Sequence, residues 1–84
     1  MYGGQYFNFK PSTVFDRDGW RCRACHRSTP PELRGTFEDR APELDHVVPL
    51  SKGGDHSMEN TQCLCRACNM KKGARTMAEF TGTI

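Results

Sequence analysis

Apolar residues are scarce in this sequence. Of its 84 residues, 36% are hydrophobic and 10% are aromatic, with a single tryptophan. A chain this short with so few apolar side chains rarely buries enough surface to fold without a covalent or metal cross-link. The sequence therefore predicts one small cross-linked domain over residues 12–84, preceded by an N-terminal arm over residues 1–11.

Long hydrophobic runs are also missing. No segment approaches the roughly 20 consecutive apolar residues of a membrane-spanning helix, so no membrane partner is expected. The N-terminal segment MYGGQYFNFKP does not combine a charged stretch with an apolar one, as secretory signals do. We therefore expect a cytoplasmic protein, in a reducing compartment where paired cysteines bind metals more often than they form disulfides.

Acidic residues are absent between residues 60 and 78, although the net charge of the whole chain is only +2. The basic residues of this stretch are Arg66, Lys71, Lys72 and Arg75. A second basic group, Arg21, Arg23 and Arg27, flanks the first cysteine pair. Two basic clusters near one site indicate a phosphate-binding surface, although a merely solvated surface remains an alternative.

Four of the five cysteines form two C-x-x-C units, Cys22 with Cys25 and Cys65 with Cys68. Two such turns bring four thiolates to one tetrahedral ion, so they predict a structural zinc site. Two disulfides, haem attachment through the C-x-x-C-H that His26 completes, and a redox dithiol are weaker alternatives, because no export signal or βαβ pattern accompanies them. Cys63 is predicted to be buried and inert, and His26 to face solvent.

The elements predicted between and beyond these units are short. Ser12 or Thr13 is expected to cap a helix that runs to Asp18 and stops at Gly19. Residues 26–43 resemble an irregular loop. Strands are predicted at 44–50 and 61–65, separated by an SKGGD turn, and a helix at 69–80. The fold class is therefore small α+β, with a β-hairpin that leads into a helix.

Residues between the two halves of the zinc site have the chemistry of a hydrolytic nuclease. His46 can act as the base that deprotonates water, because imidazole titrates near neutral pH. Asp45 and Asn69 offer the oxygen ligands that Mg2+ prefers. Neighbouring residues on a regular strand face opposite sides. Asp45 and His46 therefore cannot both face one ion from an ideal strand. Either the strand is irregular or ends at these residues, or one of the two acts on the ion through another group.

The stretch LDHVVPLSKGGDHSMENTQCLCRACNMKKG resembles the HNH endonuclease motif, with Cys22 and Cys25 as its upstream C-x-x-C. The resemblance covers about residues 12–75 and implies the ββα-metal (His-Me finger) fold, in its zinc-bearing branch. It implies that His46 is the general base, that Asp45 binds the catalytic metal, and that Asn60 orders the loop that orients the base. Asn69 stands where the final His of the motif is expected, the HNN variant, which keeps an oxygen ligand for Mg2+, Mn2+ or Ni2+.

The resemblance implies a DNA endonuclease that leaves a 5′-phosphate and a 3′-hydroxyl. Lys71, Lys72 and Arg75 follow Asn69 closely, so we expect them to contact phosphates beside the scissile bond. So small a domain has little surface for reading bases, so we expect double-stranded DNA to be bound with weak sequence preference. A homodimer, or a larger nuclease complex of bacterial or phage origin, is compatible with such a chain.

Three candidates around this motif are given minor roles. Asp55 and His56 are expected in a solvent-exposed turn rather than at the metal. Glu43 is at most a carboxylate that supports the site. Two other functions remain open: a zinc-stabilised DNA-binding module without catalysis, and a zinc module that binds protein. Metal-dependent cleavage separates the nuclease from both, and salt-sensitive DNA binding separates the two modules.

Overall fold

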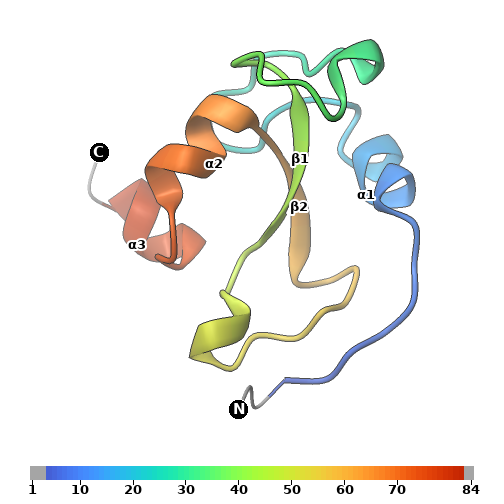
Figure 1. Cartoon of the computed structure of the whole chain (residues 1–84). Helices are drawn as coiled ribbons and strands as arrows, with labels where there is room; N and C mark the ends of the chain where they lie inside the picture. The colour runs from blue at the N-terminus through green and yellow to red at the C-terminus, as the bar shows by residue number, and fades with distance from the viewer. Residues whose placement is uncertain (1–3, 83–84) are drawn as a thin grey trace.

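The computed structural model describes residues 4–82, so residues 1–3 of the predicted arm and residues 83–84 of the predicted domain lie outside the described part. A two-stranded antiparallel hairpin, β1 (Pro42–His46) and β2 (Thr61–Cys65), forms the centre. Helix α1 (Pro11–Arg17) lies to one side of the hairpin, and α2 (Arg66–Lys72) and α3 (Met77–Gly82) lie to the other (Figure 1). The small α+β class is confirmed.

The hairpin pairs Pro42 with Cys65 at one end and His46 with Thr61 at the other. The prediction for β2 is confirmed, and all five of its residues are buried. The bounds predicted for β1 were wrong, because the strand begins at Pro42 and ends at His46 rather than spanning 44–50. Pro49 has no N–H to give to a ladder, and a 3-10 turn (Leu50–Lys52) follows it.

Helix α1 lies where it was predicted, but its start differs. Lys10 is the N-cap residue and makes no side-chain cap, while Pro11 occupies the first turn. The prediction that Ser12 or Thr13 caps this helix is therefore wrong. The ring of proline holds φ near the helical value and lacks an N–H that would be unpaired there, so proline can begin a helix without a capping side chain. The helix ends before Gly19, whose φ is +67°.

The single helix predicted at 69–80 is two helices, α2 and α3. Helix α2 begins three residues earlier than predicted, because Sγ of Cys65 caps it by accepting a hydrogen bond from the N–H of Cys68. It ends at Gly73, where φ is 57° and ψ is −135°. A new start follows at Thr76, which exchanges hydrogen bonds with Glu79 in a capping box.

The irregular loop predicted at 26–43 is confirmed over most of its length, with one 3-10 turn at Pro31–Leu33 and β1 beginning at Pro42. The main cluster of buried apolar residues is small and built largely around sulfur: Cys22, Leu64, Cys65, Cys68 and Phe80. In the part of the chain that the structure describes, no helix is both long and apolar enough to cross a membrane.

Candidate metal centre and catalytic site

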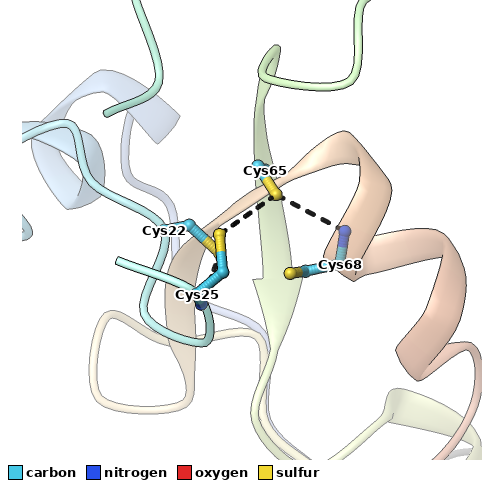
Figure 2. Close-up of side chains that lie close together, drawn as sticks. All are labelled: Cys22, Cys25, Cys65 and Cys68. Carbon is cyan, nitrogen blue, oxygen red and sulfur yellow. Dashed lines mark hydrogen bonds between the residues drawn. The ribbon is translucent and has the colours of Figure 1, made fainter. Parts of the chain in front are cut away.

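The four C-x-x-C cysteines converge on one point. Their Sγ atoms all lie within 4.8 Å of one another. Cys22 and Cys25 come from the turn after α1, Cys65 ends β2, and Cys68 lies in the first turn of α2 (Figure 2). A tetrahedral ion with Zn–S bonds of about 2.3 Å requires sulfur atoms about 3.8 Å apart. Sγ of Cys25 and Sγ of Cys65 are 3.8 Å apart, so the cluster is positioned to bind a metal ion.

The two halves of this centre have the same local geometry. The N–H of Cys25 donates to Sγ of Cys22 at 3.4 Å, and the N–H of Cys68 donates to Sγ of Cys65 at 3.4 Å. Backbone N–H groups that point at sulfur favour its thiolate form, which is the form that binds metal. The cluster joins the segment after α1 to the β2–α2 junction, so a metal ion bound there would be the cross-link that the scarcity of apolar residues predicts.

Arg27 lies beside this cluster. Its guanidinium donates to Sγ of Cys25 at 3.4 Å and to Sγ of Cys65 at 3.8 Å. Burial raises the pKa of the Cys25 thiol, but hydrogen bonds from the side chain and backbone of Arg27 outweigh it and lower this pKa to about 6. Burial raises the pKa of Cys65, and that of Cys68 further still. Arg27 therefore contributes positive charge next to the sulfur atoms of Cys25 and Cys65.

Cys63 and His26 lie apart from the four sulfur atoms. Cys63 is fully buried, as predicted, and its Sγ is 3.3 Å from the hydroxyl of Thr29. Burial raises the pKa of the Cys63 thiol, which keeps it protonated and unreactive. His26 is exposed, as predicted.

A hollow of about 280 Å³ opens between the end of β1, the turn after it and α2. It brings together three of the predicted catalytic residues, Asp45, His46 and Asn69. Its remaining lining residues are Leu44, Pro49, Leu50, Lys72 and Gly73. Asn60, the fourth predicted residue, does not line this hollow and lies at the end of the loop between β1 and β2.

Asp45 is buried in the wall of this hollow, with 7% of its surface exposed. Its Oδ1 accepts from Nζ of Lys72 at 3.1 Å, and its Oδ2 accepts from Nε2 of Gln62 at 3.0 Å. Each oxygen of a carboxylate has a second lone pair, so these two contacts orient the group without exhausting its capacity to bind a cation.

Lys72 differs from its predicted role. The sequence places it among the phosphate-contacting residues, but only 1% of its surface is exposed and its ammonium also donates to the carbonyl of His46 at 2.8 Å. A buried Asp needs a compensating charge, and Lys72 supplies it. Lys71 is exposed and Arg75 half-buried, so these two remain candidates for phosphate contacts.

His46 is the last residue of β1. Its position at the strand end is the first of the two alternatives left open for Asp45 and His46, and both residues line the hollow. Burial, followed by the nearby His56, lowers the pKa of His46 below its usual value. A lowered pKa favours the neutral imidazole, which is the form that accepts a proton.

Asn69 contacts a carboxylate that sequence reasoning placed in a minor role. Its Nδ2 donates to Oε1 of Glu43 at 2.8 Å, which directs its amide oxygen away from Glu43. Glu43 also forms an ion pair with Arg66 at 3.7 Å. The signal for this contact was the period of two along β1, which places Glu43 and Asp45 on the same face of the hairpin.

Asn60 joins the two ends of the loop between the strands. Its Oδ1 accepts from the N–H of Val48 at 2.9 Å, and its Nδ2 donates to the carbonyls of Val48 at 2.9 Å and Asp55 at 2.7 Å. The backbone of Gly54 packs so closely that a Cβ there would lie 1.9 Å from the Val48 oxygen. These contacts fix the conformation of the loop, which begins immediately after His46.

Asp55 and His56 are not the solvent-exposed turn that the sequence predicts, because both are half-buried under the N-terminal arm. Oδ1 of Asp55 accepts from the N–H of Gln5 at 2.8 Å. Nδ1 of His56 lies 2.9 Å from Nε2 of His46. Sequence reasoning missed the contacts of His56 with the arm and with His46, since no local pattern relates residue 56 to residues 5–9 or to residue 46.

A hairpin that leads into a helix is the arrangement of the ββα-metal fold, and four cysteines positioned to bind a metal ion lie around their junction. A family model described as HNH endonuclease matches residues 22–83 of the chain. The chain belongs to the HNH endonuclease family. A search of curated proteins found no match to it.

Proposed function

We propose that this protein is a metal-dependent endonuclease that hydrolyses phosphodiester bonds in DNA. The observation that carries the proposal is the hollow at the end of β1, which is lined by His46, Asp45 and Asn69, residues that can supply a base, a carboxylate and an amide oxygen. Membership of the HNH endonuclease family supports nuclease chemistry and DNA as the substrate.

His46 is the general base in this proposal. Its imidazole takes a proton from water, and the water oxygen forms a bond to phosphorus. The P–O3′ bond breaks, and the 3′ oxygen takes up a proton from solvent. The products are a 5′-phosphate and a 3′-hydroxyl. General-base catalysis of this kind contributes about 10²- to 10⁴-fold to a rate.

Asp45 and Asn69 fit a hard divalent cation such as Mg2+, Mn2+ or Ni2+. The set is one carboxylate and one amide oxygen, which suits an ion that keeps several waters for the substrate to displace. Such a cation, when bound, supplies positive charge for the phosphate and the leaving oxygen. Gln62 and Lys72 hold the carboxylate of Asp45, and Glu43 holds the amide of Asn69, so both ligands are oriented in advance.

The cysteine cluster takes a structural zinc ion in this proposal. Four thiolates close the coordination sphere, so no position is left for substrate or water. Lys71 and Arg75, on and just beyond α2, contact backbone phosphates of double-stranded DNA with weak sequence preference. We place the protein in a bacterial cytoplasm, encoded by the bacterium or by a phage.

A plasmid-cleavage assay tests the proposal. Wild type, His46→Ala and the control His26→Asn are compared in EDTA and in Mg2+, Mn2+ and Ni2+, with zinc content measured on the same samples. We expect wild type and the control to cut only with added metal, and His46→Ala to keep about one zinc and lose about 10²-fold or more of the rate. If all three bind zinc and DNA but none cuts, the protein is a DNA-binding module and the nuclease proposal fails.

A further inference from the structure

The imidazole of His46 has a partner that the nuclease proposal does not use. Nε2 of His46 and Nδ1 of His56 are 2.9 Å apart, a hydrogen-bond distance, and the two ring centroids are 5.2 Å apart with planes tilted by 47°. His56 belongs to the turn between the hairpin strands, so the contact joins the end of β1 to the middle of that loop.

Two backbone hydrogen bonds hold His56 against the N-terminal arm, and the side chain of Asp55 adds a third. The N–H of His56 donates to the carbonyl of Gln5 at 2.7 Å, and the N–H of Phe7 donates to the carbonyl of His56 at 2.8 Å. Oδ1 of the preceding Asp55 accepts from the N–H of Gln5 at 2.8 Å. The arm thus pairs with the loop as a short parallel bridge centred on Tyr6 and His56.

Two aromatic rings of the arm also fix the plane of the His56 ring. The ring centroids of Tyr6 and Phe9 lie 4.4 Å and 4.6 Å from that of His56, with planes within 23° and 19° of parallel. Aromatic pairs of this geometry contribute roughly 0.5–1.5 kcal/mol beyond their buried area. Tyr6 is 74% exposed, so its ring contributes little to the core, and stacking on His56 is its evident structural contact.

We propose that His56 is a positioning residue for His46, held in place by the N-terminal arm. In this arrangement Nδ1 of His56 accepts the hydrogen on Nε2 of His46. The lone pair of His46 then lies on Nδ1, the nitrogen on the other side of its ring, and that nitrogen takes the proton from water. The reverse tautomer would put a hydrogen on Nδ1 of His46 and leave no nitrogen free to act as the base.

The inference rests on the proposed function for its catalytic meaning, but the tautomer of His46 can be measured without any cleavage. Nitrogen-15 NMR of the imidazole rings, on the metal-loaded full chain, distinguishes Nε2–H from Nδ1–H. We expect His46 to be the Nε2–H tautomer in wild type and a mixture of both in His56→Leu. A wild-type His46 with its hydrogen on Nδ1, or a tautomer unchanged by His56→Leu, overturns the proposal.

A conservative replacement separates positioning from a structural role. His56→Asn offers an amide oxygen close to where Nδ1 of His56 lies, so it can still accept from His46, whereas His56→Leu cannot. With plasmid as substrate, we expect kcat to fall about 10- to 100-fold in His56→Leu, as for other groups that orient a catalytic residue. KM should change little, and His56→Asn should recover most of the loss. An equal loss in both variants, at equal zinc content and equal urea midpoint, contradicts the proposal.

The arm is tested by Tyr6→Ala and Phe9→Ala, with Phe7→Ala as the matched control. Phe7 lies in the same arm, and its backbone N–H, which Phe7→Ala keeps, donates to the carbonyl of His56. We expect the first two variants to loosen the tautomer preference of His46 and lower kcat, and the control to leave both unchanged. An equal effect of all three overturns the role of stacking. If wild type cuts no DNA with any metal, the proposed function fails, while the tautomer measurement still decides whether His56 fixes His46.

Discussion

At the scale of single residues, Asn60 closes the loop that follows the proposed base. Its side chain makes three hydrogen bonds to backbone groups of Val48 and Asp55. Asn60→Ala leaves these groups without their partner, and each such loss costs roughly 1–3 kcal/mol. We expect the free energy of unfolding to fall by about 2–4 kcal/mol in urea titrations. Asn8→Ala, at an exposed position, should change it by less than about 0.5 kcal/mol, and equal losses in the two variants would contradict this account.

Lys72 and Asp45 form a buried ion pair whose two members depend on each other. Lys72→Met leaves the carboxylate of Asp45 buried and uncompensated, so we expect unfolding to become easier by about 3–5 kcal/mol. Replacing Asp45 by Asn removes the stranded charge, so Lys72→Met should cost much less in the Asp45→Asn background. A double-mutant cycle in urea measures this difference. Lys71→Met, on the exposed side of α2, serves as control, and a cycle with no coupling would show that Lys72 does not neutralise Asp45.

At the scale of elements, the break between α2 and α3 depends on Gly73. Its φ of 57° with ψ of −135° suits glycine alone, and other residues in such regions cost about 1–3 kcal/mol. We expect Gly73→Ala to lower the free energy of unfolding by that amount. Gly82→Ala, in α3 with open space around its Cα, should be neutral or slightly stabilising. Equal thermal midpoints for Gly73→Ala and wild type would show that the helices can join without strain.

How far the sequence anticipated these elements depends on how local their causes are. Thr61–Cys65 was predicted with its observed bounds, because the SKGGD turn signal precedes it and the second C-x-x-C follows its start closely. The single helix predicted at 69–80 was wrong, because Thr76 and Glu79 form a capping box that begins a second helix. The same motif stands in the sequence, but inside an apparently helical period it was not read as a start.

At the scale of the whole molecule, the cysteine cluster connects the segment after α1 to the junction of β2 and α2. Cys68→Ser removes one of four ligands, and a structural zinc site contributes about 10 kcal/mol or more to folding. We therefore expect this variant to lose its metal and to be largely unfolded at 25 °C by circular dichroism, as should wild type in excess chelator. Cys63→Ala, which alters a buried thiol outside the centre, should retain one metal per chain. Metal loss in both variants would place Cys63 in the centre and contradict the assignment of ligands.

The sequence by itself determined the four-cysteine cluster and the hairpin that leads into a helix, and its resemblance to the HNH motif singled out Asp45, His46 and Asn69. The first two are local, because a C-x-x-C turn brings two sulfur atoms together and turn signals bound short strands. Only the tertiary structure decided that Lys72 lies inside against Asp45, that Glu43 holds Asn69, and that the arm presses His56 onto His46. Those contacts join residues from 10 to 50 positions apart, and which of them meet depends on the path of the whole chain rather than on any local preference.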